Sequence, residues 1–295
     1  MNDTPREQHS TYGDFEMAWF EWAPAAGSED APTILLVHAT GFHARCWDRV
    51  VALLEGRHVI AIDMRGHGRS SNTPPFDWDT FGDDLIAFVR ERKLHGAVAV
   101  GHSMGGHCVV QAAAQLPDAF SRLVLIDPVI LPVDAYAARE TWDDGEEHPT
   151  AKRRNAWQDW EEMRDRFADR LPFSAWDPRV LEDYCRYGVA ERADAAPGDK
   201  PFELACPPSV EASIYMGSAS RDIHAQAATV QVPVTVLRAR ARSADRNVMD
   251  FSGSPTDPAL ADVFPQGRDV HLPDSSHFIP MENPALAADF ILDRR

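Results

Sequence analysis

Residues 97–105 read AVAVGHSMG, and this stretch decides the fold of the chain. Its first four residues form a short apolar run, which is typical of a strand buried on both faces of a parallel sheet. The next five match the pattern G-x-S-x-G, in which a serine stands on a sharp turn between a strand and a helix. The Ala-rich segment from Met104 to Leu116 predicts that helix.

Ser103, the serine of this turn, is the predicted nucleophile. Glycines two positions before and after it let the turn and the helix approach closely, because glycine has no Cβ atom. The turn itself leaves the serine strained, which is common at functional sites. A serine that only caps the helix in a tight turn is the alternative interpretation.

Short apolar runs and helical patterns alternate on both sides of the turn. Strands connected through helices run parallel through right-handed crossovers, so the pattern predicts an α/β fold with a mostly parallel central sheet covered on both faces. Residues 15–22 alternate bulky apolar with small or acidic residues and predict an antiparallel strand at the edge of the sheet. The other predicted strands are 33–38, 59–63, 97–101, 123–127, 234–237 and 269–272, and the predicted helices are 47–54, 81–89, 104–116 and one from about 284.

The alternation stops between Pro132 and Ala228, where the sequence has no convincing strand but several helical patterns broken by prolines. We expect residues 132–228 to form a helical lid inserted into a core made of 1–131 and 229–295. A second lid helix is predicted at 178–188. The apolar face of a first lid helix is predicted from residues spaced three or four apart, namely Trp157, Trp160, Met163, Phe167 and Leu171.

Length and charge narrow the class of protein. A chain of 295 residues fits one large domain with an insertion. The 29 basic against 46 acidic residues give a net charge of -17, which repels nucleic-acid phosphates and anionic membrane surfaces. We therefore expect no nucleic-acid partner and no membrane insertion. The charge says little about the substrate, and the oligomeric state stays open.

The four cysteines indicate a reducing compartment, because they form neither a CxxC pair nor a dense disulfide framework. Residues 1–13 are polar, so we expect no signal peptide, and no later stretch is long or apolar enough to span a bilayer. A cytoplasmic protein is the expectation. Motifs for phosphate loops, dinucleotides and zinc are missing from the sequence, so we expect no cofactor and no metal.

Four ordered stretches together resemble the α/β-hydrolase superfamily, in its serine esterase and lipase-like branch with a helical cap. The resemblance covers nearly the whole chain. It implies the predicted fold and a hydrolase that attacks acyl bonds through a serine. The four stretches are 38–42 (HATGF), 63–70 (DMRGHGRS), 101–105 (GHSMG) and 274–278 (DSSHF).

The resemblance also implies the partners of Ser103. His277 follows the last predicted strand, as the histidine of this superfamily does, and would take the serine proton. The backbone N–H of Met104 would be one donor to the oxyanion of the tetrahedral intermediate. The N–H of Thr40 is the expected second donor. His38, His67 and His102 are expected to have structural or packing roles.

More than one residue offers the carboxylate that would orient His277. In the superfamily the acid usually lies a few residues beyond the strand that ends here at Leu237, but residues 238–242 contain none. Asp127 ends the strand after the nucleophile helix, as the acid does in several branches, and the carboxyl edge of a parallel sheet is where ligands gather. Asp127 is the first choice. Asp245 is the alternative, followed by Asp250 or another residue.

These residues predict a serine hydrolase that cleaves a carboxylic ester or lactone of a small, largely apolar substrate through an acyl-enzyme. Hydrolysis of a C–C bond in a diketone, or acyl transfer to another acceptor, uses the same groups and stays open. A catalytically silent member that binds a small ligand is a further alternative.

Overall fold

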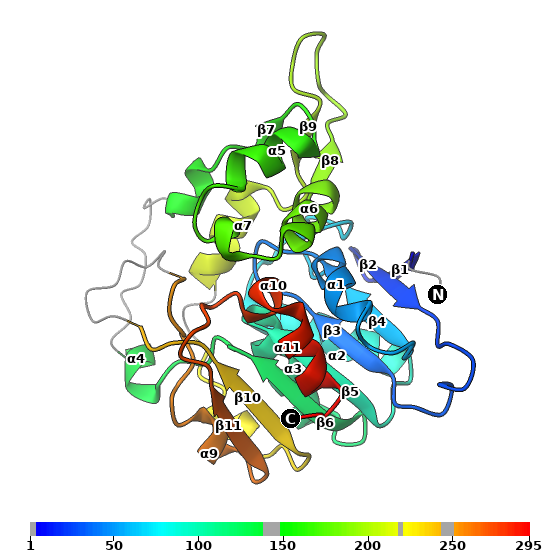
Figure 1. Ribbon diagram of the computed structural model, residues 1–295, viewed down its shortest axis with the longest axis vertical. Helices are drawn as coiled ribbons and strands as arrows, with labels where there is room; N and C mark the ends of the chain where they lie inside the picture. The colour runs from blue at the N-terminus through cyan, green and yellow to red at the C-terminus, as the bar shows by residue number, and fades with distance from the viewer. Residues whose placement is uncertain (1–3, 138–147, 218–220, 243–250) are drawn as a thin grey trace.

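The computed structural model describes residues 4–137, 148–217, 221–242 and 251–295. At its centre lies an eight-stranded sheet with the strand order β1-β2-β4-β3-β5-β6-β10-β11 (Figure 1). Only β2 pairs antiparallel with its neighbours, and the other pairs are parallel. The predicted mostly parallel sheet is thus confirmed. The strands are β1 (Arg6–Tyr12), β2 (Phe15–Trp22), β3 (Ile34–Val37), β4 (Val59–Ile62), β5 (Ala97–His102), β6 (Phe120–Ile126), β10 (Val234–Arg238) and β11 (Gly267–His271).

Helices cover both faces of the sheet. Every residue of β3, β4 and β5 is buried, as expected for strands with apolar side chains on both sides. On one face α2 (Trp78–Glu91) and α3 (Met104–Gln115) pack into one apolar core, joined by α9 (Leu260–Val263). On the other face α1 (Asp48–Val51) and α11 (Pro284–Ile291) pack into a second core.

Residues 132–228, here called the insertion, lie between β6 and β10. Figure 1 shows most of its described elements stacked over the loops at one end of the sheet. They are α4 (Val133–Ala137), a 3-10 turn (Pro149–Lys152), β7 (Ala156–Trp157), α5 (Trp160–Phe167), a second 3-10 turn (Phe173–Ala175), α6 (Pro178–Tyr187), β8 (Val189–Glu191), β9 (Phe202–Leu204), α7 (Pro208–Gly217) and α8 (His224–Ala227).

A third apolar core joins the insertion to the rest of the chain. Trp176 and Tyr184 of the insertion both pack against Phe42, which follows β3, and Trp176 also packs against Phe278, which follows β11. The ring centroids of Phe42 and Trp176 are 5.6 Å apart, and those of Trp176 and Phe278 are 5.3 Å apart. Aromatic rings at such separations add to the free energy of burial. This contact fixes the insertion above the carboxyl ends of β3 and β11.

Two sequence predictions about the insertion are wrong. It contains strands, because β7, β9 and β8 form a small antiparallel sheet. The first predicted helix is also shorter than its apolar spacing implied. Trp157 belongs to β7, α5 begins only after Asp159, whose side chain accepts from Glu162 N–H, and Leu171 lies beyond its end with 81% of its surface exposed. A local cap therefore decided where the helix starts.

A third prediction is wrong at the edge of the sheet. The strand at residues 15–22 is not at the edge, because β1 pairs along its whole length and occupies that position. β1 reads REQHSTY and is mostly polar and exposed, which suits an edge strand that must not pair with another chain.

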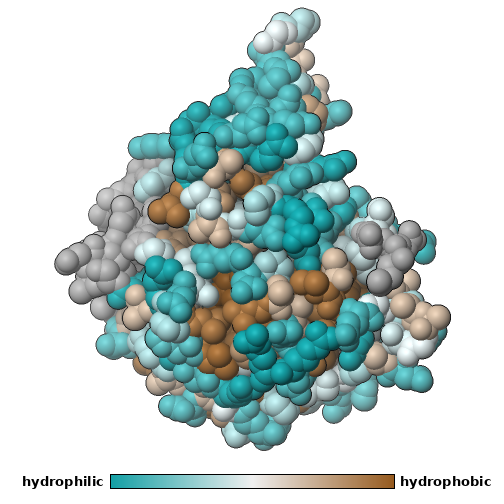
Figure 2. All heavy atoms as spheres, viewed as in Figure 1, coloured by the Kyte–Doolittle hydropathy of each residue, from teal (hydrophilic) through white to brown (hydrophobic). Residues whose placement is uncertain are grey.

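On the face that Figure 2 shows, the surface is largely hydrophilic, including the outer side of the insertion.

Candidate active site

Ser103 lies on the turn between β5 and α3, with φ 56° and ψ -118°. Such a conformation is rare for a residue with a side chain. The glycines of the motif are needed for packing. A Cβ atom at Gly101 would collide with the carbonyl oxygen of Gly105, and one at Gly105 would collide with that of Val37. The two glycines therefore allow the tight packing of this turn, which holds Ser103 between β5 and α3.

His277 reaches the serine from the loop after β11. Its Nε2 lies 3.0 Å from Ser103 Oγ, and both side chains are buried. The backbone N–H of His277 donates to Phe251 O at 3.2 Å, and the imidazole stacks on the Phe251 ring at a centroid distance of 6.0 Å. Ser103 and His277 lie 174 positions apart in the sequence, and the structure brings their side chains into hydrogen-bonding distance.

Asp127 completes a row of three side chains. Its Oδ2 lies 2.6 Å from His277 Nδ1, and its side chain is fully buried. The residue follows β6 directly, and its own N–H donates to Leu237 O at 2.7 Å. A carboxylate on Nδ1 holds the proton there and leaves Nε2 free to accept from the serine. Asp245 and Asp250, the alternatives, lie outside the described residues.

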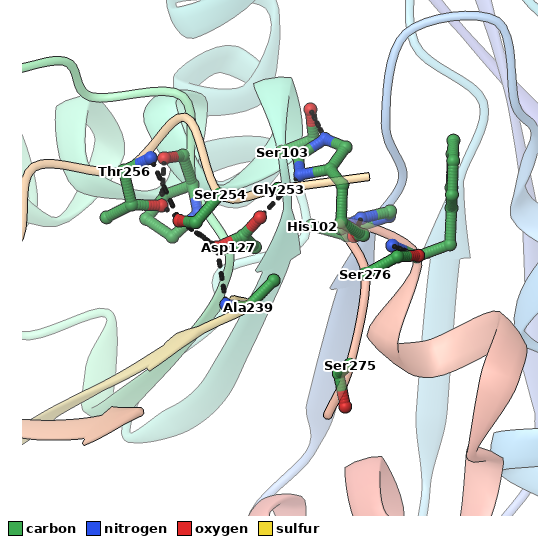
Figure 3. A network of polar contacts seen from close by, with 12 residues as sticks. His102, Ser103, Asp127, Ala239, Gly253, Ser254, Thr256, Ser275 and Ser276 are labelled. Atoms are coloured by element: carbon green, nitrogen blue, oxygen red, sulfur yellow. Dashed lines mark hydrogen bonds and ion pairs between the residues drawn. The ribbon is translucent and has the colours of Figure 1, made fainter. Parts of the chain in front are cut away.

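The second oxygen of Asp127 lies close to three polar groups (Figure 3). Oδ1 accepts from Ala239 N–H at 3.0 Å, from Ser254 Oγ at 2.5 Å, and lies 3.3 Å from Thr256 Oγ1. A buried carboxylate is costly unless hydrogen bonds surround it, and here both oxygens are occupied. Sequence reasoning did not identify Ser254 or Thr256, because a serine and a threonine in a polar loop carry no distinctive pattern.

Thr40 and Met104, the predicted oxyanion donors, are neighbours in space. Thr40 Oγ1 donates to Met104 Sδ at 3.3 Å, so the loop after β3 lies against the start of α3. Two buried histidines hold this loop. His38 Nδ1 donates to Ala39 O at 2.7 Å, and Gly41 N–H donates to His67 Nε2 at 2.9 Å. Both histidines therefore hydrogen-bond to the backbone of the loop that carries Thr40.

Burial keeps these histidines neutral. It lowers the pKa of His67 to about 4 and that of His38 well below its ordinary value. A neutral imidazole has one donor and one acceptor, and His67 uses both, on Arg65 O and on Gly41 N–H. His102 also has a lowered pKa, of about 3, mainly through burial, and its Nε2 donates to His277 O at 2.9 Å. It therefore supports the loop that carries His277.

A small recess lies between the insertion and the loop after β3. Gly41 and Phe42 line it on one side, and Arg153, Tyr184 and Glu211 line it on the other. Arg153 donates to Glu211, and its second terminal nitrogen lies 3.4 Å from Tyr184 OH. The charges in this recess are therefore paired with each other.

Among the residues that the structure describes, no group of three or more His, Cys, Asp or Glu side chains is arranged to hold a metal ion. None of the described helices has both the length and the apolar character needed to cross a bilayer.

Residues 34–290 match the model of a family described as the alpha/beta hydrolase family. Lipase LipV of Mycobacterium tuberculosis is 32% identical over 141 residues, which cover 45% of this chain and 54% of that protein. The bifunctional esterase/perhydrolase DCH of Acinetobacter calcoaceticus is 36% identical over 124 residues, covering 41% of this chain and 44% of that protein. The chain spans about half the length of the curated relatives it matches.

Solved structures match over much more of the chain. The structure of E-2-(acetamidomethylene)succinate hydrolase has a TM-score of 0.73 at 19% identity and covers 98% of both chains. The peroxisomal alpha-beta-hydrolase Lpx1 of Saccharomyces cerevisiae has a TM-score of 0.74 at 16% identity, covering 98% of this chain and 87% of that one. At such low identity the likeness concerns the fold alone.

Proposed function

The chain belongs to the alpha/beta hydrolase family, and on that premise we propose that it is a serine hydrolase that cleaves a carboxylic ester or lactone of a small, largely apolar substrate. The hydrogen-bonded row Ser103–His277–Asp127 is the observation that carries the proposal. Relatives named as a lipase and as an esterase/perhydrolase support ester hydrolysis.

The proposed reaction has two steps. As Ser103 Oγ attacks the substrate carbonyl, His277 Nε2 takes the hydroxyl proton and then gives it to the departing alcohol. Asp127 stabilises the imidazolium that forms in between. Water then attacks the acyl-enzyme with His277 again as the base, which releases the acid and restores the serine.

Backbone donors would stabilise the oxyanion in both steps. We assign this role to the N–H groups of Met104 and Thr40, since the Met104 amide directly follows the nucleophile and the two residues are in contact. Preorganised donors of this kind contribute about a hundredfold to a thousandfold each to turnover. The bonds of His38 and His67 to the neighbouring residues would keep the Thr40 loop in place.

We propose an apolar substrate because aromatic side chains lie next to His277. Phe251 stacks on the imidazole, and the Phe278 ring centroid lies 5.7 Å from it. Phe278 in turn contacts Phe42 and Trp176, so aromatic side chains continue toward the insertion. An apolar pocket with a few polar groups is the usual form of a small-molecule site. We propose that the substrate binds beside these rings and that the insertion, residues 132–228, is the lid over it.

We also place the protein in a reducing compartment, the cytoplasm being the default. The four cysteines are free thiols and all are buried, so none stabilises the fold as a disulfide.

A panel of p-nitrophenyl esters of graded acyl length tests the proposed activity beside a diketone substrate. We expect turnover of esters, with short to medium chains preferred, and loss of that turnover in Ser103→Ala. Cleavage of the diketone with no turnover of any ester would contradict the ester assignment and favour C–C hydrolysis.

A further inference from the structure

The loop at residues 251–256 holds both partners of the proposed nucleophile. Its first residue, Phe251, accepts the backbone N–H of His277 through its carbonyl oxygen. Three positions later Ser254 donates to Asp127 Oδ1. The loop is itself anchored, because Ser254 N–H donates to Arg240 O at 2.7 Å, which follows β10. A single segment therefore determines the position of the acid and of the base.

The direction of the Ser254 hydroxyl proton follows from its neighbours. Ser254 Oγ accepts from the backbone N–H of Thr256 at 3.1 Å, so one of its lone pairs is occupied. A hydroxyl has a single proton, and the acceptor within 2.5 Å is Asp127 Oδ1. Since an ionised carboxylate has no proton to give, Ser254 must be the donor. Bonds of this kind to an ionised group are about twice as strong as neutral ones.

Thr256 has a different and weaker link to the acid. Its hydroxyl lies 2.7 Å from Pro128 O and 3.3 Å from Asp127 Oδ1, so its one proton goes chiefly to the Pro128 carbonyl. Its main contribution to Asp127 is the backbone N–H that orients Ser254. The hydroxyl of Thr256 also ties the loop to the residue after Asp127.

These contacts fix the rotation of the Asp127 carboxylate. Oδ1 is held by Ala239 N–H and the Ser254 hydroxyl, so Oδ2 is the oxygen that faces His277 Nδ1. Asp127 is fully buried, and Ser254 keeps only 9% of its surface exposed. Without the Ser254 hydroxyl, a buried anion would lose a donor that solvent cannot replace.

We propose that Ser254 is a positioning residue for the acid, and that it acts on turnover through Asp127 without touching the substrate. The inference rests on the proposed function, since it assumes that Asp127 serves His277. It goes beyond that function by assigning a role to the loop after β10, whose described carboxylate, Asp257, pairs with His224. Thr256 is the residue that orients Ser254.

The test compares Ser254→Ala with Ser254→Thr, which restores a hydroxyl at the same atom, and with Thr256→Val. Ser121→Ala is the matched control, because it removes a serine hydroxyl from the other end of β6, where it donates to Ala97 O. We expect Ser254→Ala to lower kcat about 10- to 100-fold with KM within about twofold, from the usual strength of a bond to a charged group. We expect Ser254→Thr to recover most of kcat, Thr256→Val to lose only a few fold, and the control to keep full activity.

The same series measured with a fluorophosphonate separates two kinds of failure. The rate of labelling of Ser103 should fall in Ser254→Ala in parallel with kcat, because both report activation by His277. If Ser254→Ala keeps full kcat while Asp127→Asn loses it, the positioning role is wrong and the proposed function stands. If the wild-type protein is not labelled at all, the proposed function itself fails. Should Ser254→Ala not fold, Ser254→Cys, with its weak donor, decides by the same kcat and KM comparison.

Discussion

Asp127 has a different partner on each of its two oxygens, and this asymmetry gives the residue a specific role. One oxygen is held by the protein frame and the other contacts His277 Nδ1 at 2.6 Å. An amide at this position would present an N–H or a weaker acceptor to the imidazole, and the ring would then favour the tautomer with its proton on Nε2. The serine would lose its base while the fold stayed intact.

Asp127→Asn is therefore expected to lower kcat on the order of a thousandfold or more, with a much smaller change in KM. Asp257→Asn is a fitting control. Asp257 directly follows Thr256 in the loop after β10, but its carboxylate pairs with His224 at 3.2 Å and not with His277. Steady-state kinetics on an ester measure kcat and KM for both variants. Loss of activity in Asp245→Asn instead, with Asp127→Asn active, would reverse the assignment of the acid.

The sequence predicted Ser103 and His277 because each lies in a motif of fixed spacing, at the end of an apolar strand. Asp127 was the first of several choices, since an aspartate before a proline also occurs in ordinary turns. The donors to Asp127 could not be predicted. Ser254 is 127 positions from Asp127 and follows a segment without regular periodicity, so only the folded chain brings the two together.

The loop after β3 packs closely against the insertion at Gly41, next to the proposed oxyanion donor Thr40. Gly41 has φ 79°, and a Cβ atom there would lie 2.7 Å from Glu211 Oε1 of α7. Gly13 offers a matched comparison, since its φ is 64° and nothing lies within 4 Å of its Cβ position. Both positions carry the cost of a left-handed conformation for a residue with a side chain, but only Gly41 also carries a collision.

Gly13→Ala should lower the free energy of unfolding by about 1 to 2 kcal/mol and leave kcat unchanged. Gly41→Ala should lower it by more, and kcat should fall at least tenfold because the Thr40 amide shifts away from the oxyanion. Urea denaturation and ester kinetics measure the two effects. Equal stability and equal kcat in both variants would show that α7 does not constrain this loop.

At the level of elements, the sequence was most informative where strands are buried. The runs that became β3, β4, β5 and β6 contain four or more consecutive apolar or small residues, which is the pattern of a strand covered on both faces. β7, β8 and β9 have two or three residues each, too few to show any periodicity. β1 was missed because it is a polar edge strand. These elements depend on tertiary contacts more than on local pattern.

Across the whole molecule, buried neutral histidines link stability to pH. Burial lowers the pKa of His43 and His102 to about 3, that of His67 and His107 to about 4, and that of His38 well below its ordinary value. In the unfolded chain each returns to about 6.5. Between about pH 6.5 and 4 the unfolded chain therefore binds more protons, so the native state loses stability as the pH falls.

We expect the free energy of unfolding to be clearly lower at pH 5 than at pH 7.5, with each histidine contributing up to about 1.4 kcal/mol per pH unit. Burial raises the pKa of Asp63 and Asp183 to about 6 and also raises that of Asp48, Asp84 and Glu211, so these carboxyl groups act in the opposite direction and offset part of the loss. Urea titrations at the two pH values measure the difference, and His107→Gln should reduce the slope. Equal or greater stability at pH 5 would contradict the neutral state of these histidines.

Reaction with a fluorophosphonate tests the central claim most directly, because the reagent reports a serine hydroxyl activated by a neighbouring base. Intact mass spectrometry should show one adduct on the wild-type protein, located on Ser103 by peptide mapping. The adduct should be lost in Ser103→Ala and should form at least a hundredfold more slowly in His277→Gln. A wild-type protein that stays unlabelled, or one labelled equally fast without His277, would contradict the account.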